Sequence, residues 1–280
     1  MRRWTLIPII VTVCGALAAG CGSNNTPSAQ PSAIPDIIAA PTAGPAGVAA
    51  PLSQLVHVAL STTLVSSVHF TMKSTLHGDG QPTTVTVTGN NDLGQHSGTQ
   101  DVTLSSGPTR RLHEVLVPQQ IYFTSGNAAS GPWTNVPRGE ILLQHLLRPP
   151  ANDPKYPLVQ AKQITNVVKR GTGSLDGLSN VTHYTGILSE STMLQDATPT
   201  KRDHLAAILA GMPKAQTPVD VWVDKDGRVT RVTETISAAS KGFSGTLTID
   251  VSAYGIAVNK TAPKPSTPMT VAALPANLLG

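Results

Sequence analysis

Cys21 is the residue near the N-terminus whose type and surroundings predict covalent chemistry. It follows Ala18, Ala19 and Gly20, and small residues before a cysteine match the lipobox of bacterial lipoproteins. Small side chains let a signal peptidase reach the bond before the cysteine, and only a thiol can form the thioether to diacylglycerol. Ala18 stands where leucine is more common, with Leu17 one position earlier. We therefore expect Cys21 to be a lipid anchor; the alternative is an ordinary signal peptide cut nearby, which leaves Cys21 a free thiol.

Residues 1–20 have the pattern of a lipoprotein signal peptide. Arg2 and Arg3 supply the positive start, and the apolar stretch 6–13 is shorter than the roughly 20 residues of a membrane-spanning helix. Acyl chains such as palmitate on Cys21 would hold the protein stably, because two chains anchor where one is marginal. The predicted location is the extracytoplasmic face of the cell membrane, with the chain attached by lipid.

Catalytic motifs are missing from the sequence. The stretches 173–177 and 242–245 both miss the G-x-S-x-G pattern, and no H-E-x-x-H, P-loop or G-x-G-x-x-G occurs. The 8 histidines have no metal-ligand spacing, and 2 cysteines cannot build a four-cysteine zinc site. The formal charge of +4 falls to +2 without Arg2 and Arg3, which leaves no nucleic-acid footprint. We expect neither an enzyme nor a cofactor, a metal or a nucleic-acid partner.

Composition divides the chain into a signal, a tether, a domain and a tail. Residues 21–50 are rich in Pro, Ala and Ser with almost no charge, which predicts a flexible tether. Residues 51–258 are numerous enough for one domain with a sizeable core. The prolines within 259–280 predict a disordered tail, although the apolar stretch 269–274 could dock locally.

Hydrophobic periodicity predicts an α+β domain built on one large antiparallel sheet. Apolar residues at helical spacing predict a first helix over 52–64, with Ser53 as a candidate cap near its start. Asp224–Gly227 has the chemistry of a tight hairpin turn. Leucine-rich stretches predict further helices near 141–147 and 200–212. Alternating apolar and polar residues predict strands over 68–76, 84–88, 99–104, 111–117, 121–124, 167–168, 181–188, 219–223, 229–236 and 245–251.

The two later helices are more apolar than packing on a sheet requires. If the sheet curves into a half-barrel, helices on its concave face would enclose an apolar cavity suited to acyl chains, since each buried methylene contributes about 0.8 kcal/mol. The alternative is a closed core built from the same side chains. The residues predicted to line the cavity are Leu142, Leu143, Leu146, Leu147, Leu205, Ile208 and Leu209. Trp222 is a weaker candidate, because Asp220 and Asp224 share its face of the strand and predict exposure.

The order of several short patterns along the chain resembles the actinobacterial lipoprotein family that includes LprG, LprA, LprF and LppX. The patterns are the lipobox at Cys21, the helix running into 65–72, the 120–122 strand followed by Trp133, the 180–188 strand with the helix after it, and 218–224 with 227–229. The resemblance implies a LolA/LolB-like half-barrel around a lipid cavity. The chain differs from the family in a longer tether, an extra stretch at 149–157 and an extended tail.

Pattern and resemblance together predict a membrane-anchored, extracytoplasmic lipoprotein. It would bind acylated lipid or lipoglycan in the apolar cavity and carry it within the cell envelope, with a membrane transporter as a candidate further partner. The alternative is an anchored surface interaction or signalling module of the same fold, with a filled core and no lipid ligand.

Overall fold

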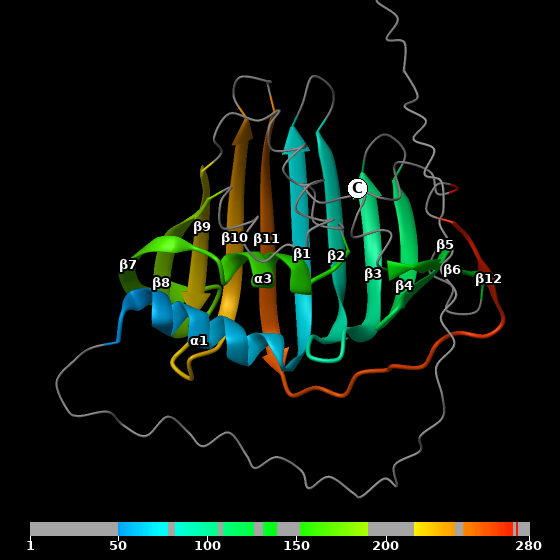
Figure 1. Ribbon diagram of the computed structural model, residues 1–280, viewed down its shortest axis with the longest axis horizontal. Coiled ribbons are helices and arrows are strands. Elements are labelled where there is room, and N and C mark those ends of the chain that lie inside the picture. Colours follow the sequence, from blue (N-terminus) through cyan, green and yellow to red (C-terminus); the bar gives the residue numbers. More distant parts are fainter. Residues whose placement is uncertain are drawn as a thin grey trace, which may run out of the picture. The chain divides into compact units, whose positions relative to one another are not determined.

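One large sheet with two helices on one of its faces makes up the described part of the chain (Figure 1). The structure, a computed structural model, describes residues 50–77, 82–105, 109–125, 131–138, 152–189, 216–238, 243–270 and 273. The helices are α1 (Leu52–Leu64) and α3 (Lys155–Ala161). The strands are β1 (Ser67–His77), β2 (Thr83–Asp92), β3 (Ser97–Ser105), β4 (Arg110–Val117), β5 (Gln120–Ser125), β6 (Trp133–Pro137), β7 (Thr165–Leu175), β8 (Leu178–Ser189), β9 (Gln216–Val223), β10 (Val229–Ala238), β11 (Phe243–Tyr254) and β12 (Ser266–Pro268).

The strands form one twelve-stranded sheet in the order β12-β6-β5-β4-β3-β2-β1-β11-β10-β9-β8-β7. Neighbours pair antiparallel, except that β12 runs parallel to β6. Strands β1–β6 and β7–β11 are each laid down in chain order. The two halves meet where β1 pairs with β11, from Val68 opposite Tyr254 to His77 opposite Ser244. The predicted α+β class, with a large, curved and mostly antiparallel sheet, is confirmed.

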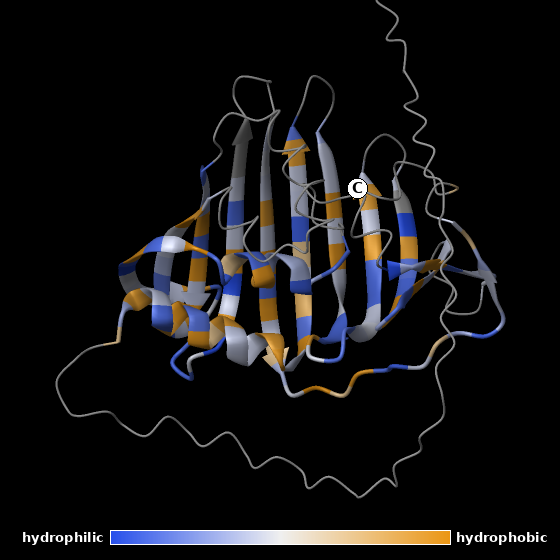
Figure 2. Ribbon diagram, in the orientation of Figure 1, coloured by the Kyte–Doolittle hydropathy of each residue, from blue (hydrophilic) through white to orange (hydrophobic). Residues whose placement is uncertain are grey.

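The alternation of residue types decides which face of the sheet is buried. Phe70 and Met72 of β1 are fully buried, whereas Thr71 between them faces the opposite side. The buried face packs directly against Leu60 of α1 and Leu158 of α3, both also fully buried. Figure 2 shows hydrophobic and hydrophilic residues alternating along the strands. The region under the two helices is therefore a hydrophobic core.

The sequence-based elements agree with the described structure in most places. Helix 52–64 and all the predicted strands are confirmed. The predicted cap is wrong: Pro51 is the N-cap residue of α1, and no side chain caps the helix. Pro51 provides a fixed φ but no side-chain acceptor, so α1 gains its stability from the buried side chains along one face.

Three short elements, β6, α3 and β12, were not predicted from the sequence. Strand β6 begins at the isolated Trp133, and α3 has prolines at its N-cap and third position, a pattern that resembles a loop. Strand β12 lies in the segment predicted to be disordered. Ser266 pairs with Trp133, and Lys260 Nζ lies 2.6 Å from Asp92 Oδ2. Hydrogen bonds and an ion pair thus hold parts of 259–270 against the sheet.

Candidate functional site

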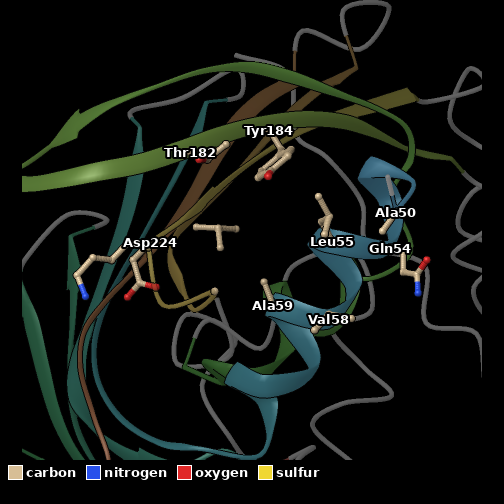
Figure 3. A pocket seen from close by; sticks show the side chains of 11 residues that line it. Ala50, Gln54, Leu55, Val58, Ala59, Thr182, Tyr184 and Asp224 are labelled. Atoms are coloured by element: carbon tan, nitrogen blue, oxygen red, sulfur yellow. The ribbon is translucent and has the colours of Figure 1, made fainter. Parts of the chain in front are cut away.

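An open, largely apolar pocket lies between the N-terminal half of α1, strand β8 and the turn after β9 (Figure 3). Its volume is about 310 Å³, at the lower end of the roughly 300–1,000 Å³ common for small-molecule sites. Leu55 and Ala59 point from α1 toward the side of the pocket formed by Tyr184. The lining residues are Ala50, Gln54, Leu55, Val58, Ala59, Thr182, Tyr184, Val223, Asp224, Lys225 and Gly227.

The two sides of the pocket differ in polarity. On the α1 side, Leu55 is 45% exposed and Val58 55% exposed, so apolar surface remains in contact with solvent. On the opposite side, Asp224 and Lys225 place charged groups at the rim. An apolar wall beside a charged rim suits a molecule that joins a hydrocarbon segment to a polar group, because each part finds matching surroundings.

Thr63, near the end of α1, fixes this helix to the sheet. Its hydroxyl oxygen accepts a hydrogen bond from the backbone N–H of Val229, over 3.2 Å, and lies 3.0 Å from the hydroxyl oxygen of Tyr254. Tyr254 also donates to the carbonyl oxygen of Val229. Burial raises the pKa of Tyr254 to about 12, which keeps its hydroxyl protonated as a donor. The α1 wall of the pocket is thus tied to β10 and β11.

The turn between β9 and β10 forms the charged rim. The Asp224 carboxylate accepts hydrogen bonds from the backbone N–H groups of Asp226 and Arg228, each over 2.9 Å. The Arg228 guanidinium donates to Asp224 over 2.9 Å and lies 4.9 Å from the centre of the Tyr254 ring. Gly227 has a φ of 75°, which a residue without a side chain adopts at low cost. These contacts confirm the predicted hairpin turn.

A buried carboxyl, Glu114, lies in the inner face of the sheet at some distance along it from the pocket strands. Gln100 Nε2 donates to it over 2.9 Å, and Asn152 Nδ2 lies 2.8 Å from each of its carboxylate oxygens. Asn91 in turn donates to Gln100 over 3.1 Å. Burial raises the pKa of Glu114 to about 7, despite these stabilising donors. The carboxyl therefore titrates near neutral pH.

The same network holds the start of α3. Arg138 Nη2 lies 2.8 Å from Asp153 Oδ2, in an ion pair whose side chains are only 5% and 9% exposed. Arg138 Nη1 also donates to the carbonyl oxygen of His96, over 2.7 Å. The other oxygen of Asp153 accepts from the backbone N–H of Lys155, the first residue of α3. A buried charge pair of this kind is costly to break, because the remaining partner would be left uncompensated.

A second buried carboxyl, Glu234, lies on the inner face of β10. It is 3% exposed, and its Oε1 atom has no hydrogen-bond partner within the described ranges. Burial raises its pKa to about 8, so the carboxyl is mostly uncharged at neutral pH. Tyr156 of α3 is close enough for the negative charge of Glu234 to add to the effect of burial in raising the tyrosine pKa.

The structure leaves the predicted cavity residues untested. Cys21, Leu142, Leu143, Leu146, Leu147, Leu205, Ile208 and Leu209 all lie outside the described residues, as do the predicted helices 141–147 and 200–212. The enclosed apolar cavity thus stays a prediction. Trp222, the weaker candidate, is half-buried and stacks on His183, with ring centres 4.5 Å apart and planes 4° from parallel.

Sequence reasoning missed the residues that form the described pocket, although part of the signal was present. The helical spacing of apolar residues in 52–64 includes Leu55, yet Leu55 and Val58 are exposed while Val56 and Leu60 are buried in the core. Apolar residues on more than one side of a helix indicate a second contact surface. Glu114 could also have been found, because strand alternation places it on the same face as the buried Leu112.

The described part of the chain contains neither a metal-binding cluster nor a membrane-spanning helix. Among those residues, no group of three or more His, Cys, Asp or Glu is arranged to hold a metal ion. No helix within the same ranges combines the length and the apolar character needed to cross a bilayer.

Comparison with known proteins gave likeness in fold only. No family model and no curated protein matches the sequence. A solved structure of the Pseudomonas aeruginosa MucA/MucB complex is similar at 12% identity and TM-score 0.32, over 73% of this chain and 58% of that chain. A LolA superfamily protein from Nitrosomonas europaea is similar at 8% identity and TM-score 0.30, over 75% of this chain and 96% of that one. A DUF1329 family protein from Desulfovibrio piger is similar at 8% identity and TM-score 0.27, over 74% and 93%.

The likeness to these solved structures concerns the fold alone. The chain spans less than two thirds of the MucA/MucB chain it matches. At such identities and TM-scores no argument about ligand or partner rests on the neighbours. The class that the described residues define is a curved, mostly antiparallel sheet covered on its inner face by two helices, with an open apolar pocket beside the first of them. Membership of the actinobacterial lipoprotein family stays a prediction.

Proposed function

We propose that this protein is a membrane-anchored, extracytoplasmic lipoprotein that binds acylated lipid or lipoglycan and carries it within the cell envelope. The observation that carries the proposal is the apolar pocket beside α1, whose charged rim gives a lipid headgroup a polar neighbour. The lipobox at Cys21 supports the anchored location. Neither a catalytic motif nor a described metal cluster supports an enzyme.

The pocket suits one hydrocarbon segment. Each methylene transferred from water contributes about 0.8 kcal/mol, so even a short stretch of acyl chain against Leu55, Val58 and Ala59 gains useful affinity. A second hydrocarbon chain needs more room than 310 Å³ of open pocket provides. The further space would come from the cavity predicted at 142–147 and 205–209.

A second candidate function is an anchored surface interaction or signalling module without lipid. The hydrophobic core beneath α1 and α3 favours it, because Phe70, Met72 and Leu158 are fully buried in one cluster there. The two functions differ in one measurable respect, which is the presence of lipid on the purified protein.

Lipid extraction and native mass spectrometry of the purified chain test the proposal. We expect co-purified acylated lipid, and Leu55→Trp should lower the amount, since an indole fills the pocket mouth. Leu178→Trp is the matched control, because Leu178 is exposed to a similar degree, 47%, and lies outside the pocket lining. Protein that is repeatedly lipid-free after isolation from its own membrane would favour the second candidate.

A further inference from the structure

The outward side of α1 lacks the charged residues that normally solvate a surface helix. Its sequence, LSQLVHVALSTTL, contains no Lys, Arg, Asp or Glu, and His57 is its one titratable residue. Surface helices usually place charged and polar residues opposite the buried stripe. In α1 the exposed side carries Leu55 and Val58 beside the polar Gln54 and His57.

Leu55 and Val58 form one apolar surface at the mouth of the pocket. They are three residues apart, so their side chains are neighbours on the helix. Both line the pocket and both keep about half of their surface in solvent. Burying these two side chains in an apolar medium would remove the exposed apolar surface without hiding a charge.

The electrostatics beside this surface are balanced. Lys225 Nζ lies 2.8 Å from Asp226, and Arg228 lies 2.9 Å from both Asp224 and Asp226. The cations of the pocket rim are therefore paired with carboxylates of the same turn. A partner that contacts this end of the domain is attracted by apolar contact rather than by net charge.

The connection to Cys21 limits where this end of the domain can be. Ala50 lines the pocket and directly precedes α1, and residues 22–49 separate it from Cys21. The tether that composition predicts here would have a root-mean-square span of roughly 30 Å. With Cys21 acylated, α1 is the element of the domain closest along the chain to the membrane.

We propose that Leu55 and Val58 insert into the boundary between headgroups and acyl chains of the membrane leaflet that holds Cys21. The pocket then opens toward that leaflet, so an acyl chain can pass from the bilayer into it without crossing water. This inference rests on the proposed anchored function, and it adds the surface by which the domain contacts its membrane. Apolar side chains on a surface helix bind a membrane interface in proportion to the apolar area that they bury there.

A fluorescent probe on the full, acylated chain tests the proposal. Cys21 is blocked by acylation, so Val58→Cys introduces one thiol for an environment-sensitive dye. Thr246→Cys is the matched control, because Thr246 is exposed on β11 and alternates with the buried Leu247, on the face turned away from α1. Both labelled proteins are reconstituted into vesicles of phosphatidylcholine, with or without phosphatidylglycerol.

We expect the emission of the dye at position 58 to shift to shorter wavelength on reconstitution and to be quenched by brominated lipid. The dye at position 246 should show neither effect, and phosphatidylglycerol should change neither result. Adding Leu55→Glu to the position 58 variant should reduce the shift, because a carboxylate opposes insertion.

The outcomes separate this inference from the function on which it rests. If the native protein, isolated from its own cells, carries no acyl group on Cys21 and is found in solution, the anchoring is overturned, and the inference with it. An anchored, lipid-loaded chain whose dye at position 58 reports water overturns the inference alone. Equal shifts at positions 58 and 246 also overturn it, since the contact would then not be specific to α1.

Discussion

The hydroxyl oxygens of Thr63 and Tyr254 lie 3.0 Å apart although 191 positions separate the two residues in the sequence. Thr63 is the second-last residue of α1, and Tyr254 is the last residue of β11, the last long strand. Their contact also includes the backbone of Val229 at the start of β10. Three distant parts of the chain therefore meet at one buried polar point, which holds the helix that forms the pocket wall.

Removing the Tyr254 hydroxyl should weaken the contact between α1 and strands β10 and β11. Tyr254→Phe leaves the Val229 carbonyl oxygen without its side-chain donor, and we expect a loss of about 1–2 kcal/mol in the free energy of unfolding. Urea denaturation measures the change. Tyr122→Phe on β5 is the control, and equal effects of the two substitutions would show that the Thr63–Tyr254 contact has no special role.

The raised pKa of Glu114 makes stability depend on pH. Its folded-state pKa of about 7 lies above the ordinary value of 4.5, so the unfolded chain releases the proton more readily. The free energy of unfolding should therefore fall as pH rises from about 4.5 to about 7, by up to about 3 kcal/mol. Below about pH 4.5 Glu114 is protonated in both the folded and the unfolded chain, and its contribution to stability is fully present.

Glu114→Gln tests the assignment, because the amide is similar in shape and does not ionise. The difference in unfolding free energy between about pH 5 and about pH 8 should shrink in this variant. Glu234, with a pKa of about 8, causes a separate decline in the free energy of unfolding that continues to higher pH. This decline should remain in Glu114→Gln. An unchanged pH profile in Glu114→Gln would assign the dependence to other groups.

The C-terminal strand should depend on one side chain. Met269 packs against the small cluster of Leu116, Ile121 and Val136, and its backbone N–H donates to the Asn135 carbonyl oxygen over 2.9 Å. Met269→Ser should release β12 and raise hydrogen exchange along β6, at a cost of about 1 kcal/mol because the side chain is half-buried. Thr267→Ser, on an exposed residue of β12, should leave exchange unchanged. Equal exchange in both variants would contradict the anchoring role of Met269.

The lipid anchor is testable in cells. Cys21→Ala removes the thiol that forms the thioether, so we expect the protein to leave the membrane fraction and enter the culture medium. Immunoblotting of the two fractions measures the change. Retention of the variant in the membrane to the same extent would mean that another attachment holds the chain.

The sheet was predictable because its strands repeat a simple alternation. The pattern around Phe70 and Met72, and the turn chemistry of Asp224–Gly227, depend only on neighbours in the sequence. The pocket was not predictable, because it depends on where α1 crosses the sheet, and that is decided by long-range contacts such as Thr63 with Tyr254. Strand β12 was not predicted for the same reason: three residues that end in Pro268 become a strand only because β6 offers an open edge.

The pairing of β1 with β11 has a consequence for how the chain matures. The first strand leaves the ribosome early, yet one of its edges has no strand partner until residues 243–254 have followed. Sheet closure therefore waits for a pairing between segments far apart in the sequence, and such long-range pairings form slowly. A topology that closes late keeps one edge of β1 open during folding, and an open strand edge can pair with a strand of another molecule.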